Sequence, residues 1–128
     1  MFSAQVSGLK SQIITIEVDI FRGFHSFSVV GLPDKAVEES RDRVSSAIKS
    51  VGFGSPKSEG QQKIVVSLAP ADLKKEGPLF DLPMALAYLL AAQEIGFDPA
   101  RRLFLGELSL GGALQPLNGA LLLAKGAR

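Results

Sequence analysis

The chain has 128 residues, enough for one domain with its own hydrophobic core. It contains no cysteine, which excludes a disulfide framework, a thiolate nucleophile and a zinc site built on sulfur. The 14 Lys and Arg residues against 13 Asp and Glu residues leave a net charge of +1, too balanced for binding to nucleic acid or membrane by bulk charge alone.

The longest apolar run extends from Leu82 to Ala92 and contains Pro83. A membrane span needs about twenty apolar residues, which is well beyond this length, so we interpret the run as a buried helix. The first residues have neither the basic start nor the apolar stretch of a signal peptide. We therefore expect a cytoplasmic protein without a membrane partner.

Alternation of apolar and polar residues predicts three strands within the first thirty residues. Ile14, Ile16, Val18 and Ile20 recur with a period of two, which buries one face of a strand. A strand over residues 2–9 is expected to place Phe2, Ala4, Val6 and Gly8 on one face, and residues 26–30 are expected to form the third strand. Short connections favour antiparallel pairing of these neighbours.

The period changes after residue 30, where a helix is predicted. Asp34 is a plausible N-cap, and the apolar stripe that follows consists of Val37, Val44, Ile48 and Val51. Gly52 and Gly54 are expected to end this helix. The stretch that follows, up to Gln62, is polar and is interpreted as a loop.

The rest of the chain predicts further strands and helices. Residues 63–69 are short and β-branched, as is typical of a central strand covered on both sides or nearly so. A buried helix is expected from about Phe80 to Gln93, with Asp81 as its cap and Pro83 in its first turn. Residues 102–108 are expected to form a strand, Gly111-Gly112 a tight turn, and residues from 117 onward a third helix. Because that helix is still running at residue 128, we interpret the chain as a piece of a longer protein.

These elements predict a single α+β domain over residues 1–128. The expected architecture is a two-layer sandwich, with helices on one face of a mixed sheet.

Few residues indicate chemistry. His25 has no nearby partners for a metal site or a serine–histidine pair. Gly-Lys-Ser and Gly-Lys-Thr are absent, so the chain does not bind nucleotides through a Walker loop. The pairs Lys74-Lys75 and Arg101-Arg102 could each contact a phosphate backbone, but charges that merely flank helices and strands explain them equally well.

Three stretches carry a resemblance to a known family: residues 30–41 (Val-Gly-Leu-Pro-Asp-Lys-Ala-Val-Glu-Glu-Ser-Arg), residues 68–78 (Leu-Ala-Pro-Ala-Asp-Leu-Lys-Lys-Glu-Gly-Pro) and residues 80–83 (Phe-Asp-Leu-Pro). Together they resemble the N-terminal domain of the Mg-chelatase-related AAA+ ATPases, the YifB and ComM group of bacterial competence proteins. The resemblance covers nearly the whole chain and is weakest in the loop from Gly54 to Gln62.

The resemblance implies a fold similar to ribosomal protein S5 domain 2 and to the Lon peptidase domain. The Lon-type pattern has a serine after a Gly-Pro loop and a lysine on a later helix. Here Leu79 follows Gly77-Pro78, and Leu121 stands where the lysine would be, although Gly106-Glu107, Gly112 and Pro116 match the pattern between them. Because leucine cannot carry a proton, the resemblance implies a scaffold that has lost its catalytic dyad.

The function implied by the resemblance is that of a non-catalytic accessory domain, with no cofactor or metal of its own, in a larger ATPase. The parent would hydrolyse ATP with Mg²⁺, form a hexamer and act as a DNA branch-migration helicase in natural competence. This domain would contact the rest of the AAA+ chain, or DNA, through its motif loops. The candidate contact residues are Gly31, Leu32, Pro33, Asp34, Ala69, Pro70, Asp72, Lys74, Lys75, Gly77, Pro78 and Asp81.

Other interpretations remain open. The glycines and prolines of both loops could simply shape turns, with Asp34 and Asp72 fixing backbone N–H groups. The chain could also be a stand-alone nucleic-acid-binding domain of the S5 type, or a Lon-type peptidase, which the two leucines disfavour. Insertion of a metal into a porphyrin has no supporting histidine or carboxylate cluster in this sequence.

Overall fold

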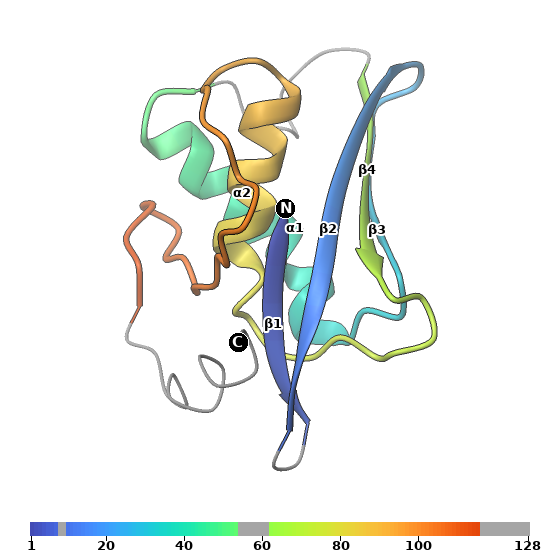
Figure 1. Cartoon of the computed structure of the whole chain (residues 1–128). Helices are drawn as coiled ribbons and strands as arrows, with labels where there is room; N and C mark the ends of the chain where they lie inside the picture. The colour runs from blue at the N-terminus through green and yellow to red at the C-terminus, as the bar shows by residue number, and fades with distance from the viewer. Residues whose placement is uncertain (8–9, 54–61, 116–128) are drawn as a thin grey trace.

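The computed structural model describes residues 1–7, 10–53 and 62–115. Its elements, in chain order, are β1 (Phe2–Ser7), β2 (Lys10–Arg22), β3 (Ser26–Val30), α1 (Lys35–Ser50), β4 (Gln62–Ala69) and α2 (Asp81–Ala91). The four strands form one sheet in the order β1-β2-β4-β3, and both helices pack on the same side of it (Figure 1). The α+β class and the mixed sheet are therefore confirmed.

The sheet is mixed because β4 lies between β2 and β3. β2 is antiparallel to both β1 and β4, whereas β3 is parallel to β4, with α1 as the crossover between them. The expectation that β2 and β3 would pair as neighbours is wrong. Their connection is short, but β4, which comes later in the sequence, occupies the position between them.

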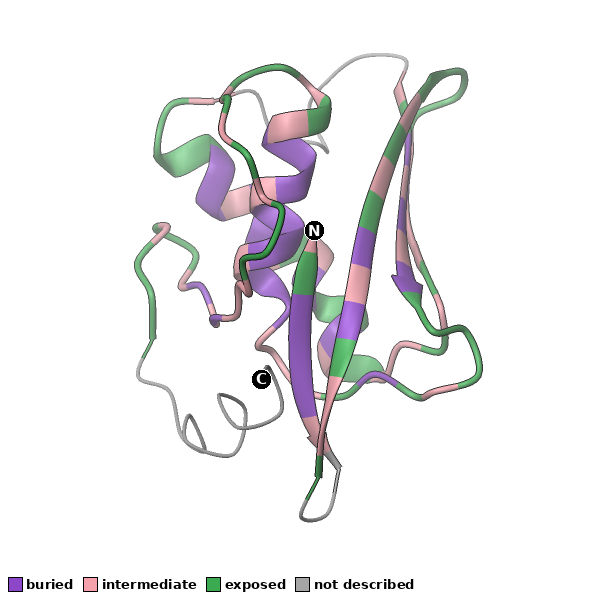
Figure 2. Cartoon of the chain, in the orientation of Figure 1, coloured by how far each residue is buried: buried purple, intermediate pink, exposed green. Residues whose placement is uncertain are grey.

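The core lies between the sheet and the two helices. Alternate residues of β2 and β4 face it, and Figure 2 shows buried residues on the helix surfaces that face the sheet. The largest fully buried side chains of the core include Ile14, Ile16, Ile64, Leu68, Val37, Val44, Ile48, Phe80 and Met84. The opposite face of the sheet carries exposed residues such as Glu17 and Lys63, so β4 is central but is covered by helices on one side only.

The predicted helix α1 is confirmed, with one exception in its stripe. Val37, Val44 and Ile48 are buried, but Val51 is 56% exposed, because it is the C-cap residue and the chain turns away at Gly52. The role predicted for Gly54 lies outside the described residues.

Predictions near the two ends of the chain need correction. The first strand is confirmed as β1, but it ends at Ser7, and both of its faces hold buried residues, Ala4 on one and the polar Ser3 and Gln5 on the other. Residues 102–108 do not form a continuous strand and contribute only the isolated bridges Phe2–Leu103 and Leu108–Leu114. The backbone at Gly106 bonds instead to the start of α2, accepting from Leu82 N at 3.0 Å and donating to Leu79 O at 2.8 Å.

The predicted turn at Gly111-Gly112 is confirmed by two backbone hydrogen bonds of Ser109. Gly112 N donates to Ser109 O, and Ser109 N donates to Ala113 O. The third helix predicted from residue 117 lies outside the described residues. Among the helices in the described part of the chain, none is long and apolar enough to cross a membrane.

Candidate functional site

The two glycine- and proline-containing loops of the family motif lie side by side and are bonded to each other. Pro33 and Lys75 form an isolated parallel bridge. Lys75 N donates to Leu32 O and Asp34 N donates to Lys75 O, each at 2.9 Å. We call this assembly, residues 31–34 with residues 69–78, the joined loops. The structure thus brings together two segments that the sequence only suggested separately.

Gly31 allows this close approach. Its φ angle is +110°, and a Cβ built on it would lie 2.0 Å from the backbone oxygen of Leu68. No side chain fits there, because the chain leaving β3 lies directly against the backbone of β4 at Leu68. The next residue, Leu32, also has a positive φ of 56° and is 53% exposed.

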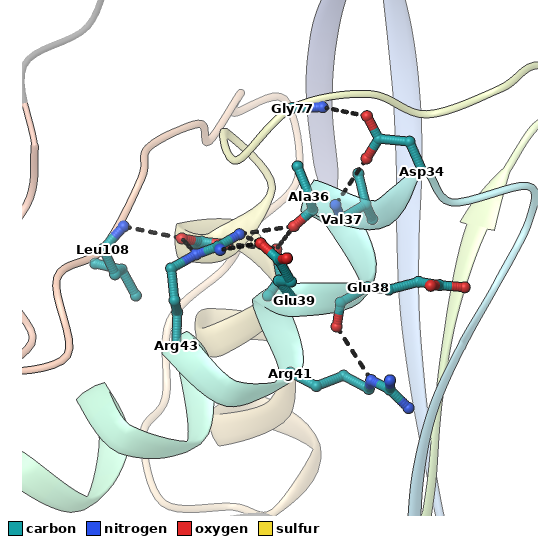
Figure 3. A network of polar contacts seen from close by, with 11 residues as sticks. Asp34, Ala36, Val37, Glu38, Glu39, Arg41, Arg43, Gly77 and Leu108 are labelled. Carbon is teal, nitrogen blue, oxygen red and sulfur yellow. Dashed lines mark hydrogen bonds and ion pairs between the residues drawn. The ribbon is translucent and has the colours of Figure 1, made fainter.

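Asp34 uses one carboxylate oxygen to cap α1 and the other to bond the second loop (Figure 3). Oδ1 accepts from Val37 N at 2.8 Å, which confirms the predicted N-cap of α1, and Oδ2 accepts from Gly77 N at 3.2 Å. The second bond crosses to a loop more than forty residues later in the chain and could not be anticipated from helix capping alone.

We expect Asp34→Ala to lower the free energy of unfolding by about 1–2 kcal/mol, because it removes the cap and leaves the Gly77 N–H without its acceptor. Asp34→Asn should restore part of this loss, since its amide oxygen can still cap α1. Urea unfolding followed by far-UV circular dichroism measures the change, with the exposed Asp19→Ala as control. Equal losses for Asp34→Ala and Asp19→Ala would contradict the assignment.

Lys75 is fully buried, although it was predicted as half of a basic surface pair. Its ammonium donates to Gly31 O at 2.7 Å and to Pro70 O, so it links the motif loops from within. Burial lowers the pKa of Lys75 below the usual 10.5, because desolvation penalises the charged form, and the nearby Asp72 carboxylate partly opposes this shift. A group held in this way cannot contact a phosphate backbone together with exposed Lys74.

The lowered pKa of Lys75 predicts a pH dependence of stability. The folded state holds the ammonium proton of Lys75 less tightly than the unfolded state does. The contribution of Lys75 to the free energy of unfolding therefore rises as pH approaches 10.5, and it is lost as pH falls through the folded-state pKa. The free energy of unfolding of wild type minus that of Lys75→Met should therefore increase between pH 8 and pH 10 in urea titrations. Lys74→Met, which removes an exposed ammonium, is the matched control, and an equally steep increase for it would contradict the burial argument.

Gln5 is a contact residue that the sequence did not reveal. It extends from β1 into the second motif loop, where Nε2 donates to Lys74 O at 2.7 Å and Oε1 accepts from Glu76 N at 3.0 Å. The only available signal was a polar residue within a predicted strand, which does not specify a partner some seventy residues away. Gln5 and Lys75 together fix the backbone of residues 74–76.

Asp81 does not cap α2. The N-cap is Phe80, and Asp81 is the first helical residue, completely buried. Its carboxylate accepts from Ser40 Oγ, from Arg43 Nε at 2.7 Å and Nη2 at 3.1 Å, and from Leu108 N at 3.1 Å. Figure 3 labels Arg43 and Leu108, two of these partners. The side chain thus joins α1, α2 and the segment around Gly106, and Arg43 also lies 3.7 Å from Glu39. The hydrogen bond from Arg43 to Asp81 raises the pKa of Arg43, although partial burial opposes this shift.

Only some of the candidate contact residues are exposed at the surface. Leu32, Ala69, Pro70, Asp72 and Lys74 are exposed, and Gly31, Pro33, Gly77 and Pro78 are half-buried. Leu79, at the predicted nucleophile position, is also half-buried, and Leu121 lies outside the described residues. In the described ranges no three His, Cys, Asp or Glu residues come close enough to hold a metal ion, and His25 is exposed.

The second basic pair remains at the surface. Arg101 and Arg102 are exposed and line a shallow pocket of about 410 Å³ together with Phe2, Ile13 and Leu103. Two exposed arginines and the exposed Phe2 therefore line the same pocket.

Comparison with known proteins agrees with the resemblance inferred from the motifs. The family model described as subunit ChlI of Mg-chelatase matches residues 16–128. Among curated proteins, competence protein ComM of Haemophilus influenzae is 38% identical over 122 residues, which is 94% of this chain and 23% of ComM. YifB of Escherichia coli is 44% identical over 115 residues, or 89% of this chain and 22% of YifB. Rv2897c of Mycobacterium tuberculosis is 40% identical over 121 residues, or 94% of this chain and 23% of that protein.

The chain therefore spans less than a quarter of the length of these relatives. The matched region contains all three motif stretches, which supply the residues of the joined loops and, in the Asp81 network, Ser40 and Asp81. The chain belongs to the family of the Mg-chelatase subunit ChlI, as a relative of ComM and YifB.

Proposed function

We propose that this chain is the N-terminal, non-catalytic module of a Mg-chelatase-like AAA+ ATPase, and that the joined loops contact the rest of that protein. The observation that carries the proposal concerns three charged side chains of the motif stretches. Asp34, Lys75 and Asp81 all make hydrogen bonds within the domain, so they shape the surface and are not available to a substrate.

The surface built in this way has a definite chemical character. Leu32 exposes an apolar side chain at a backbone position held by the bridge between Pro33 and Lys75. Exposed Asp72, Lys74 and Glu76 lie on the neighbouring loop. A fixed apolar residue beside mixed charges suits a protein–protein contact better than a nucleic-acid contact, which favours clustered positive charge.

The fold is consistent with the finer architecture proposed for the domain, that of ribosomal protein S5 domain 2 and the Lon peptidase domain. The mixed sheet with helices on one face supports this relation. Leu79 lies next to Gly106, whose N–H donates to its carbonyl, so the Gly-Pro loop and the Gly-Glu segment of the Lon-type pattern are adjacent. With leucine in the nucleophile position, we expect no cleavage of unfolded casein by this chain.

The properties proposed for the parent rest on the family resemblance. One relative is a competence protein, and the family is that of a Mg-chelatase subunit. We infer a hexameric parent that uses ATP and Mg²⁺ and acts on DNA in competence. The ATP and Mg²⁺ would bind elsewhere in the parent, since this sequence contains no Walker loop.

The first test is to read the gene beyond codon 128. A continuing frame with Gly-x-x-x-x-Gly-Lys-Ser or Gly-Lys-Thr is expected, and an immediate stop codon would overturn the proposal. In the longer protein, the double variant Leu32→Asp/Lys74→Glu should then reduce hexamer formation and Mg²⁺-dependent ATP hydrolysis. Lys49→Glu, an exposed charge reversal at the other end of α1, is the control. Identical behaviour of both variants would show that the joined loops are not the contact surface.

A second candidate function, binding of nucleic acid by this domain itself, is favoured by Arg101 and Arg102 beside exposed Phe2. Arginine pairs next to an aromatic ring can contact a phosphate backbone and a stacked base. Fluorescence anisotropy with single- and double-stranded DNA at low salt tests this. Binding that is lost in Arg101→Ala/Arg102→Ala, and kept in Lys49→Ala, would support it, whereas no binding at tens of micromolar would reject it.

A further inference from the structure

One half of β2 has no neighbouring strand on the side where β1 lies. β1 pairs with residues 10–15 of β2, and Met1 extends this pairing to Ile16. Ile16 N donates to Met1 O at 2.7 Å, and Met1 N donates to Ile16 O at 3.2 Å. From Glu17 to Arg22, β2 pairs with β4 alone. Figure 1 shows β2 continuing well past the N-terminus with no further strand beside it on that side. We call residues 17–21 of β2 the free edge.

The free edge presents backbone groups that can accept another strand. Ile16 directs both its N–H and its C=O towards Met1, so by the alternation of an antiparallel strand Val18 and Ile20 direct theirs to the same side. Within the described ranges, no backbone or side-chain hydrogen bond reaches these groups of Val18 and Ile20. An unpaired row of this kind is a template for pairing with an extended chain.

A depression accompanies the free edge, between β2 and α2. It has a volume of about 330 Å³ and is lined by Ile16, Glu17, Val18 and Asp19 of β2 and by Met1, Ala87, Leu90 and Pro99. Ala87 and Leu90 belong to α2, so the depression lies between the helix and the unpaired half of β2. A strand added here would place every second side chain in this depression.

The other face of the free edge is acidic. Glu17 and Asp19 are exposed, and neither makes an ion pair in the described part of the chain. Their partners on β4 are Ser67 and Val65, which carry no charge, and Lys63 on the same face lies opposite Phe21. A strand paired with the free edge would therefore meet two carboxylates that make no ion pair within the described residues.

From this geometry, we propose that the free edge of β2 binds an extended segment of a partner protein in which basic and apolar residues alternate. The segment runs antiparallel to β2, as β1 does further along the same side. Its apolar residues enter the depression beside Leu90, and its basic residues pair with Glu17 and Asp19. Backbone hydrogen bonds to Val18 and Ile20 supply affinity, and the alternating side chains supply specificity.

A second copy of this chain is a poor occupant of the free edge. Antiparallel pairing of two such edges would place Glu17 and Asp19 of one copy opposite the same carboxylates of the other. Like charges directly across a strand pair are destabilising. The site therefore favours a partner of opposite charge, independently of whether the joined loops contact an ATPase.

The direct test uses a fluorescein-labelled Lys-Val-Lys-Leu-Lys-Val peptide with blocked ends, titrated against the 128-residue chain at low salt. In the proposed antiparallel pairing the leucine N–H faces β2 and the lysine N–H groups face away. N-methylation at the leucine should weaken binding by about tenfold or more, because it removes a backbone bond and blocks close approach. N-methylation at the central lysine is the matched control and should have little effect. Equal effects of the two methyl groups, or no binding at millimolar concentration, would overturn the proposal.

The charge requirement is tested on the protein. Glu17→Lys/Asp19→Lys should weaken binding of the basic peptide about fivefold, as expected for two exposed ion pairs, and should create binding of Glu-Val-Glu-Leu-Glu-Val. Asp72→Lys/Glu76→Lys makes the same change in net charge away from the free edge and should leave this preference unchanged. If both double variants behave alike, only net charge matters and the site is rejected. A peptide-independent dimer in sedimentation that is abolished by Val18→Pro would also reject it, in favour of a second copy.

Discussion

Replacement of Asp81 by alanine is expected to lower the free energy of unfolding by about 3–5 kcal/mol, because it removes the buried counter-charge of a partly buried guanidinium. Asp81 is completely buried and accepts hydrogen bonds from Ser40, Arg43 and Leu108. Truncation removes the acceptor of Leu108 N and of Arg43 Nε, leaves Ser40 and Arg43 with their bonds to Ala36 O, and unlinks α1, α2 and the segment around residue 108. A loss of this size is a large fraction of the stability of a small domain.

Two further variants separate charge from hydrogen bonding at this position. Asp81→Asn keeps an acceptor oxygen but removes the charge, so its loss should lie between wild type and Asp81→Ala. Glu39→Ala removes the exposed partner of Arg43 and should cost about 0.5 kcal/mol or less. The sequence has no tryptophan and a single tyrosine, so urea unfolding is best followed by far-UV circular dichroism. If Asp81→Ala is no more destabilising than Glu39→Ala, the buried network does not support the fold.

Gly31→Ala is expected to be the other severe substitution, with a loss of about 3 kcal/mol or more from steric overlap and an unfavourable φ angle. The added Cβ would lie 2.0 Å from Leu68 O, an atom of the central strand, so relief requires the backbone of β3 or β4 to move. Such a movement would also separate Lys75 from Gly31 O.

Gly52→Ala is the matched control for this prediction. Gly52 has a similar positive φ of +98°, but a Cβ there would meet nothing within 4 Å. It should therefore show the conformational penalty alone, about 1 kcal/mol. Thermal unfolding of the two variants compares these costs. Similar midpoints for Gly31→Ala and Gly52→Ala would show that the strands at Gly31 adjust without significant cost.

The features that the sequence predicted correctly are governed by local interactions. The alternation around Ile14 and Ile16 identified β2, and the spacing of Val37, Val44 and Ile48 identified α1. Asp34 was recognised as a cap because its acceptor role involves an N–H only three residues away. The three motif stretches identified the family because their residues are unusual as a set.

The features that the sequence missed depend on contacts between distant segments. Residues 102–108 have a strand-like composition, but the backbone at Gly106 is taken up by Leu79 and Leu82. Asp81 was placed at a helix end by its position before an apolar run, yet its partners come from α1 and residue 108. The burial of Lys75 depends on carbonyl groups of Gly31 and Pro70, and no local pattern distinguishes it from exposed Lys74.

The central position of β4 sets the order in which this domain can fold during synthesis. β1, β2, β3 and α1 all leave the ribosome before β4, yet β2 and β3 do not pair with each other and each needs β4 as a partner. Until Ala69 has emerged, the apolar face of β2 around Ile16 has no completed sheet beside it. The nascent chain therefore exposes unpaired strand edges during translation, a state prone to aggregation. Closure of the sheet by β4 is a long-range step that we expect to limit the folding rate.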